Sequence, residues 1–280
     1  MNQSEMRTLG LLAAGLVLLP FVLLAGGLTI TSAVDCVLLA VVGLGLNVLL
    51  GQTGLVSFGH GAWFGIGAYA VAILQIRFFP DSVVVPIALA IVIVAISAVL
   101  IGALVLRRRG VYFSLLTLAF SALCFTVAFR WTSLTGGENG LGGVERRSVL
   151  GYSLDQPFAF YVFVAIQALL VALFLLRMSH APFGHVLVAI RENEVRTRFL
   201  GYPVMAYKLL AFVISATVTG YAGGLFVLNH RIASAESLSV SFSGELLALV
   251  LIGGMRFYAG PIVGALFFVL FREYLSMLTE

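Results

Sequence analysis

Long apolar runs, separated by short polar breaks, make up most of the chain. Reading the runs against the breaks predicts about nine helical segments, at 9–30, 33–50, 54–75, 83–106, 111–129, 158–177, 207–228, 244–256 and 261–278. About 20 helical residues cross the hydrocarbon core of a bilayer, so most of these segments are long enough to span it. The expected fold class is all-α, a polytopic membrane helix bundle with about 8–10 transmembrane or re-entrant segments. It would form a single transmembrane domain over residues 1–280.

Two hydrophilic stretches interrupt the apolar pattern, one at about 130–157 and one at about 178–206. Lys and Arg residues near the ends of spans concentrate on the cytoplasmic side of membrane proteins. With a cytoplasmic N-terminus, ten of these residues would lie inside and six outside. The first stretch would then be an outer loop and the second a cytoplasmic one. Nine crossings would leave the C-terminus outside, so we expect either one re-entrant segment or a final span that is absent.

Composition supports a membrane protein and argues against a soluble, nucleic-acid-binding or disulfide-rich protein. The chain is 61% hydrophobic and 10% charged, whereas a soluble domain carries about 25% charged residues. Its net charge of +4 could indicate nucleic-acid binding, but the arginines are scattered between spans, which favours positive loops and no nucleic-acid partner. The first apolar run is too long for a signal peptide and is expected to be retained. Cys36 and Cys124 lie in apolar runs, so a disulfide framework is not expected.

Sequence motifs for nucleotide, metal and hydrolase chemistry are absent. A P-loop needs Gly-Lys-Ser/Thr, and the only lysine is Lys208 in "AYKLL". The four histidines form no HExxH pair, and there is no GxSxG elbow. We therefore expect no catalytic residue, no metal site, no bound cofactor and no ATPase site in this chain. An intramembrane enzyme has no residue pattern in its favour.

The stretch "LLGQTGLVSFGHGAWFGIGAY", from Leu49 to Tyr69, is unusual because it is polar and rich in glycine inside an apolar chain. Interrupted helices are tolerated at membrane depth only where they face protein or a water-filled cavity. Gln52, Ser57 and His60 are therefore candidates for lining or gating a transport pathway. Asp35 and Glu245 are further candidates for a functional role, Glu245 in the pathway, although a position at the membrane interface is the alternative for a carboxylate near a span end.

Small residues recur at a spacing of four. Such spacing lets helix backbones approach closely in a membrane. We expect close helix packing at Gly61 and Gly65 (in a ladder with Ser57), at Gly220 with Gly224, and at Gly260 with Gly264.

The second hydrophilic stretch contains "AIRENEVRTRFLGYPVMAYKLLAF", a charged amphipathic segment followed by Gly201 and Pro203. A solvated loop with positive-inside charges would explain it. The sharper interpretation is a short helix that docks into a partner protein, because amphipathic helices bind readily in grooves.

Five stretches together resemble one family, and they occur in family order over nearly the whole chain. They are "LNVLLGQTGLVSFGHGAWFGIGAYAVAIL" (46–74), "GVYFSLLTLAFS" (110–121), "TSLTGGENGLGGV" (132–144), "AIRENEVRTRFLGYPVMAYKLLAFVISA" (189–216) and "GGMRFYAGPIVGAL" (253–266). In these stretches the chain is similar to the LivM-type inner-membrane permease of branched-chain amino acid ABC importers. It departs from the family's pattern at Arg198 and Phe199, at Arg256, and in ending soon after its last apolar segment.

The resemblance implies a set of partners: a second homologous permease subunit, two cytoplasmic ATP-binding subunits that hold ATP and Mg, and a periplasmic solute-binding protein. It also implies a bacterial inner membrane as the location. The stretch 189–203 would be the coupling helix that contacts an ATPase subunit, with Arg191, Glu192, Asn193, Glu194 and Gly201 as coupling residues. Asn139, in the outer loop, would lie near the outer gate or the binding-protein face.

The resemblance further implies ATP-driven alternating access, with branched-chain or other aliphatic amino acids as the first substrate class. Urea or short-chain amides are the alternative substrates, and sugars are less favoured by the motifs. A stand-alone secondary transporter would predict paired broken helices in inverted repeats, and the sequence offers one glycine-rich break without a persuasive second copy. An assembly scaffold without transport is a third possibility.

Overall fold

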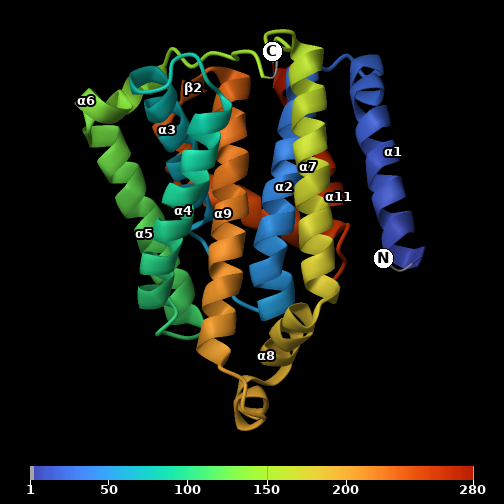
Figure 1. The fold of residues 1–280 in the computed structure, drawn as a ribbon, viewed down its shortest axis with the longest axis vertical. Coiled ribbons are helices and arrows are strands. Elements are labelled where there is room, and N and C mark those ends of the chain that lie inside the picture. Colours follow the sequence, from blue (N-terminus) through green and yellow to red (C-terminus); the bar gives the residue numbers. More distant parts are fainter. Residues whose placement is uncertain (1–2, 150, 280) are drawn as a thin grey trace.

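The structure is a computed structural model that describes residues 3–149 and 151–279 (Figure 1). Residues 1–2, 150 and 280, which the expected single domain includes, lie outside the described residues. The long helices are α1 (Gln3–Ala25), α2 (Ile30–Asn47), α3 (His60–Arg77), α4 (Val84–Val105), α5 (Val111–Arg130), α7 (Pro157–His180), α8 (Pro182–Phe199), α9 (Val204–His230), α10 (Val240–Gly253) and α11 (Gly260–Thr279). The short elements are η1 (Val48–Thr53), α6 (Thr132–Thr135), η2 (Gly137–Asn139), β1 (Leu141–Gly142), β2 (Ile232–Ala233) and η3 (Ala235–Leu238).

The prediction of a polytopic helical bundle is confirmed. Within the described residues, six helices are long and apolar enough to cross a membrane, judged by length and composition. The burial of these helices differs widely: 94% of the apolar window of α2 with η1 is buried, against 11% of that of α1. α2 is therefore a core helix, whereas α1 presents most of its apolar surface outward, as a helix facing lipid would.

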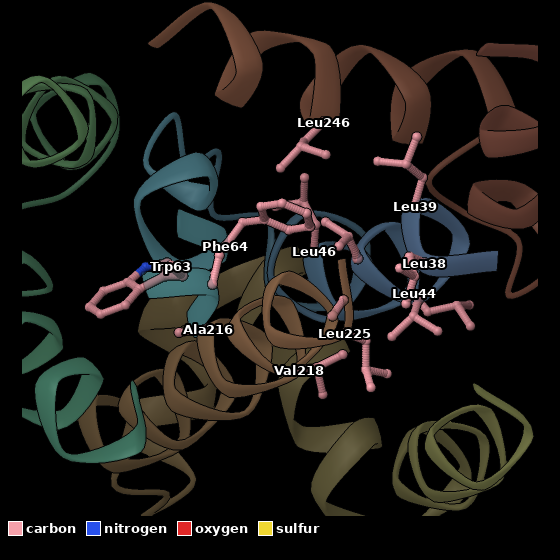
Figure 2. Close-up of a cluster of buried hydrophobic side chains, with 14 of the residues drawn as sticks. Leu38, Leu39, Leu44, Leu46, Trp63, Phe64, Ala216, Val218, Leu225 and Leu246 are labelled. Atoms are coloured by element: carbon pink, nitrogen blue, oxygen red, sulfur yellow. The ribbon is translucent and has the colours of Figure 1, made fainter. Parts of the chain in front are cut away.

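At the centre of the bundle, α9 packs against both α3 and α2. Gly67 on α3 lies against the backbone of Gly220 on α9, and Gly223 lies against the Phe64 carbonyl. Without side chains at these positions the two backbones approach closely. Figure 2 shows the buried apolar side chains gathered around this crossing, with Leu46, Phe64, Leu225 and Leu246 coming from four different helices.

Two connections that are not α-helical contribute buried residues to the bundle. The first is the α2–α3 connection, where η1 is a π-helical turn and Gly54 has a left-handed φ of 75°. The predicted segment 54–75 begins too early, because the chain is non-helical until His60. The second interruption is residues 231–239, between α9 and α10. This second break was not predicted, because the stretch lacks the glycines that mark the first.

The two hydrophilic stretches lie at opposite ends of the bundle, as expected. α8 is drawn at the bottom of Figure 1, and α6 with β2 at the top. β1 pairs antiparallel with β2 at that upper end, joining Leu141 to Ala233. α11 ends at the top of Figure 1, at the opposite end of the bundle from α8, and α1 runs from about mid-height to that same upper end.

Candidate functional site

The first polar cluster lies where α3 begins. His60 is 1% exposed and contacts two hydroxyls: its Nδ1 lies 3.0 Å from Ser57 Oγ, and its Nε2 lies 2.8 Å from Ser215 Oγ on α9. Ser57 and Ser215 are fully buried. Ser57 Oγ also accepts from the Gly59 N–H at 3.3 Å. The imidazole therefore ties the helix interruption to α9.

The same interruption is tied to α10 and α5. Ser243 Oγ accepts a 2.9 Å hydrogen bond from the Gly61 N–H and lies 3.2 Å from Ser121 Oγ, which donates to the Leu238 carbonyl at 2.8 Å. On the other side of the break, Thr117 Oγ1 accepts from the Phe58 N–H at 3.1 Å. These hydroxyls satisfy backbone groups that would each cost about 1–3 kcal/mol if buried without a partner.

The five predicted pathway residues are not gathered in one place. Ser57 and His60 are in contact, and both point into protein. Gln52 lies on η1, Asn139 is exposed at the outer-loop end, and Glu245 is partly buried on α10. No hydrogen bond or ion pair joins these three to Ser57 or His60 within the described chain. Their role in a pathway stays a prediction.

Sequence reasoning missed the hydroxyl partners of the break. Thr117, Ser121, Ser215 and Ser243 are buried within apolar helices. Single Ser and Thr residues in apolar runs carry no spacing signal, and only the fold shows that they converge on residues 57–61.

A groove of about 910 Å³ runs between α4, α7 and α9. Apolar side chains line most of it, and Gln167, Thr217 and Tyr221 contribute polar atoms. None of the predicted pathway residues lines this groove. The groove is therefore separate from the polar break around Ser57 and His60.

The predicted coupling segment is helical, as its pattern indicated, but it consists of two pieces. Asn193 interrupts α8 with a non-helical φ of −156° and ψ of 93°. Its Oδ1 accepts from the Arg196 N–H at 2.9 Å, which is the N-cap interaction of a new helix. Gly201 ends the segment with a left-handed φ of 89°, where a glycine is favoured.

Glu194 is the electrostatic centre of this region. Its Oε2 lies 2.6 Å from Lys208 Nζ on α9, and its Oε1 lies 3.0 Å from Arg198 and 3.2 Å from Arg109, which follows α4. Burial disfavours the charged carboxylate, but the hydrogen bond and charge of Lys208, together with both arginines, outweigh it. The pKa of Glu194 is therefore lowered from its ordinary value. One carboxylate thus joins α8, α9 and the α4–α5 connection.

Arg191 and Glu192, both predicted to contact an ATPase subunit, face different ways. Arg191 Nη1 donates to the Gly51 carbonyl on η1. The Glu192 side chain is 71% exposed and lies 4.0 Å from Arg191. Glu192 is open to a partner, whereas Arg191 reaches into the bundle.

The tip of α8 exposes large apolar side chains. Val195 is 58% exposed, Phe199 88% and Leu200 70%. We call these three residues the α8 tip. Contiguous exposed apolar side chains at a polar end of a protein are typical of an interaction site.

All six predicted packing glycines lie against other elements. A Cβ on Gly61 would lie 2.6 Å from Ser243 Oγ, and Gly65 faces Leu238. Gly220 faces Val94 and Gly224 faces Val71, while Gly260 and Gly264 lie against the backbone of Gly254 and Leu249. Ser57 does not extend the ladder, because it precedes α3 and is not helical.

A second charged cluster lies at the end of the bundle that carries β1 and β2; the sequence singled out Asp35 but not its partners. Asp35 on α2 is 3% exposed, and its Oδ1 lies 2.9 Å from His230 Nε2 and accepts from Asn229 Nδ2 at 2.9 Å. Arg146 Nη2 donates to Asn229 Oδ1 at 2.8 Å, and its guanidinium lies 4.2 Å from the Phe160 ring centre. Burial, with the nearby Arg231, lowers the pKa of Arg146. This cluster fastens the 130–157 stretch to α2 and α9.

Comparison with known proteins gives one consistent family. The profile described as "Branched-chain amino acid transport system / permease component" matches residues 28–280. The chain is 31% identical, over 93% of its length, to the high-affinity branched-chain amino acid transport system permease protein LivM of Escherichia coli K12, of which it covers 66%. The chain thus spans about two thirds of that relative's length.

More distant similarities extend to an archaeon and to sugar permeases. The chain is 25% identical, over 85% of its length, to the probable branched-chain amino acid transport permease protein LivM of Methanocaldococcus jannaschii, and covers 78% of it. It is 24% identical, over 70% of its length, to the ribose import permease protein RbsC of Haemophilus influenzae, and covers 63% of it. No solved structure matches.

Proposed function

The chain belongs to the permease family of branched-chain amino acid transport systems, and from this premise we propose that it is the membrane-spanning subunit of an ABC importer. The observation that carries the proposal is the family match over residues 28–280, which includes every element from α2 to α11. Its substrates would be branched-chain or other aliphatic amino acids, as in the names of its bacterial relatives. ATP and Mg would be held by partner subunits.

The partners follow from the same premise. A second homologous permease subunit would complete the membrane unit, two cytoplasmic ATP-binding subunits would supply energy, and a periplasmic solute-binding protein would deliver substrate. The exposed α8 tip supports an ATPase contact, because it offers apolar anchors next to the charged Glu192.

The proposed orientation places α8 in the cytoplasm and the outer loop in the periplasm of a bacterial inner membrane. The cationic residues support this, since Arg107, Arg108 and Arg109 lie in the α4–α5 connection and Arg177 near the start of α8. α1 would then begin on the cytoplasmic side, and α11 would end on the periplasmic side.

The proposed mechanism is alternating access. Closure of the ATPase subunits would move α8, and α8 would bias the spans between inward and outward states through contacts that differ in the two. α8 is suited to this because it is joined to α9 through Lys208, to the α4–α5 connection through Arg109 and to η1 through Arg191.

Two other substrate classes are alternatives. Sugars are one, because the chain is similar to a ribose import permease, and urea or short amides are the other, from the family resemblance.

A stand-alone secondary transporter is the alternative from a different class of protein. One observation favours it: the structure has a second connection that is not α-helical at residues 231–239. A stand-alone transporter, however, would have no ATPase subunit to cover the exposed apolar side chains of the α8 tip.

Uptake by reconstituted complex tests the proposal. The chain would be co-expressed with a second permease, ATPase subunits and a binding protein, if its neighbouring genes encode them, and proteoliposomes would be assayed with labelled leucine, valine, urea and ribose. We expect leucine and valine uptake that requires both ATP and binding protein.

The alternatives give different results in the same assay. Uptake of urea or ribose alone would reassign the substrate. Leucine uptake without ATP would indicate a secondary transporter, and ATP hydrolysis with no uptake of any of the four would favour an assembly role.

A further inference from the structure

Arg191 faces the inside of the bundle although it belongs to the segment expected to contact a partner. Its side chain is 29% exposed, and its guanidinium donates to the carbonyl of Gly51. Its aliphatic stem rests on the turn that follows, since a Cβ on Gly54 would lie 2.8 Å from Arg191 Cγ. Both parts of the side chain therefore contact the end of η1.

The end of η1 around the Gly51 carbonyl is a favourable location for a cation. η1 continues α2 without a gap, so the carbonyls around Gly51 form the C-terminal end of one long helical segment. That end carries partial negative charge, which favours a nearby Arg or Lys. Here the cation comes from α8, and Arg191 makes the hydrogen bond that links these two elements in the described part of the chain.

η1 itself is an unusual segment. It is a π-helical turn, a form that is rare and often found at functional sites. Asn47, just before it, is 7% exposed, and its Oδ1 has no hydrogen-bond partner among the described residues. Gln52 Oε1 is likewise buried and unpartnered within them. Buried acceptors without a partner are uncommon and costly. The contacts of η1 with neighbouring elements must therefore offset this cost.

The other side of η1 contacts the α10–α11 connection. The Met255 carbonyl lies directly against Gly51, where a Cβ would collide with it and with Asn47 Oδ1. Gly51 is therefore held between Arg191 on α8 and Met255 before α11. A displacement of α8 would change the Arg191–Gly51 contact and, through Gly51, the contact with Met255.

We propose that Arg191 is a positioning residue that couples the position of α8 to the conformation of η1. When α8 moves, the Gly51 carbonyl is released or pulled, η1 changes its hydrogen-bond register, and the unpartnered amide oxygens of Asn47 and Gln52 meet new donors. The change is then passed to Met255 and α11. This inference rests on the proposed function, which supplies the movement of α8, and it names the contact through which that movement enters the membrane domain.

The first test measures coupling in the reconstituted complex. Arg191→Gln keeps a polar side chain but removes the charge, and Arg191→Lys keeps the charge with fewer donors. We expect Arg191→Gln to lower the number of leucine molecules moved per ATP by about 10-fold or more, while ATP hydrolysis stays within about 2-fold. Arg191→Lys should retain an intermediate ratio. Arg108→Gln, in the exposed α4–α5 connection, is the matched control and should leave the ratio unchanged.

The second test uses the purified chain alone and needs no transport. Amide hydrogen exchange over residues 48–58 should be about 10-fold faster in Arg191→Gln than in the wild type, with α7 and α9 unchanged. Equal exchange at 48–58, or an unchanged transport-to-ATP ratio, would overturn the inference. A parallel fall in transport and hydrolysis would also overturn it, because it indicates a general structural role. If Arg191→Gln does not fold, the same exchange comparison is made with Arg191→Lys.

The two proposals fail separately. A wild-type complex that transports nothing with ATP counts against the proposed function, and hydrogen exchange still decides whether Arg191 controls η1. A wild-type complex that transports leucine, with full coupling in Arg191→Gln, leaves the function standing and removes this inference.

Discussion

Lys208 Nζ, near the start of α9, lies 2.6 Å from Glu194 Oε2 on α8, and the Lys208 side chain is 10% exposed. The same carboxylate holds Arg198 and Arg109. A lysine this buried would be left as an unpaired charge if the carboxylate were lost. The pair therefore holds α8 against α9 at the end of the bundle proposed to meet the ATPase.

We predict that Glu194→Gln destabilises the chain in a pH-dependent way. Because the pKa of Glu194 is lowered in the folded state, its stabilisation is present above the unfolded pKa of about 4.3 and is lost as pH falls through the folded value. Loss of charged hydrogen bonds of this kind costs about 1.5–3 kcal/mol at neutral pH. Apparent melting temperatures in detergent, measured from about pH 7 down to about pH 2, should differ between wild type and variant at neutral pH and converge only below the unfolded pKa of about 4.3.

Glu192→Gln is the matched control, since the Glu192 side chain is 71% exposed and its nearest charged partner is 4.0 Å away. It should melt like the wild type at every pH. A Glu194→Gln curve that stays parallel to the wild type down to acid pH would show that the charge network contributes no pH-dependent stability.

Removing the Ser243 hydroxyl should weaken the contact between the two interruptions. Ser243→Ala leaves the Gly61 N–H without its acceptor and removes a neighbour of Ser121. A buried group left unsatisfied costs about 1–3 kcal/mol. Thermal unfolding in detergent should show a lower midpoint for Ser243→Ala. Ser97→Ala, which removes a hydroxyl bonded only to the carbonyls of its own helix, should change it little; equal losses in both would contradict the proposed role of Ser243.

The α3–α9 crossing should not tolerate a methyl group. At Gly67, a Cβ would collide with the backbone carbonyl of Gly220, which cannot move without shifting α9. Overpacking costs about 1–3 kcal/mol, and the cost rises when backbone must move. Gly67→Ala is therefore expected to lower the melting temperature and the yield of monodisperse protein.

Gly244→Ala provides the comparison for that variant. Gly244 also lies within a helix, and a Cβ there would meet nothing within 4 Å. Alanine favours helix by about 1 kcal/mol over glycine, so Gly244→Ala should be neutral or slightly stabilising. If Gly67→Ala behaved in the same way, the backbones of α3 and α9 would be less tightly packed than described.

Much of the helical framework could be predicted from the sequence. Apolar runs predicted the helices well, because the length of a span and its hydrophobicity follow directly from the membrane. The polar, glycine-rich stretch after α2 predicted the first interruption for the same reason. The interruption at 231–239 was missed, since its hydroxyls and short elements do not stand out from an ordinary loop.

The candidate site was less predictable, because its parts meet only in three dimensions. His60 was recognised as unusual, but its partner Ser215 is 155 positions away. The family resemblance assigned Arg191 to the coupling segment, and that role stays a prediction. Its contact with the Gly51 carbonyl could not be predicted from periodicity, because the two residues are 140 positions apart.

The α8 tip gives the most direct prediction about the proposed assembly. Phe199 is 88% exposed, so Phe199→Ser should leave the fold and melting temperature of the isolated chain unchanged. Buried aromatic anchors often contribute about 2 kcal/mol or more to an interface. We therefore expect Phe199→Ser to weaken binding of the ATPase subunit by about 10-fold or more, measured by titration of labelled ATPase onto the chain in nanodiscs.

Phe78→Ser controls for the loss of an exposed aromatic side chain. Phe78 is 66% exposed and follows α3 at the end of the bundle opposite α8. It should bind the ATPase subunit like the wild type. Unchanged binding in Phe199→Ser would contradict docking through the α8 tip, whereas equal losses in both variants would mean that the ATPase contact does not depend on which end carries the substitution. Only a loss confined to Phe199→Ser supports α8 as the surface through which ATP hydrolysis reaches the membrane helices.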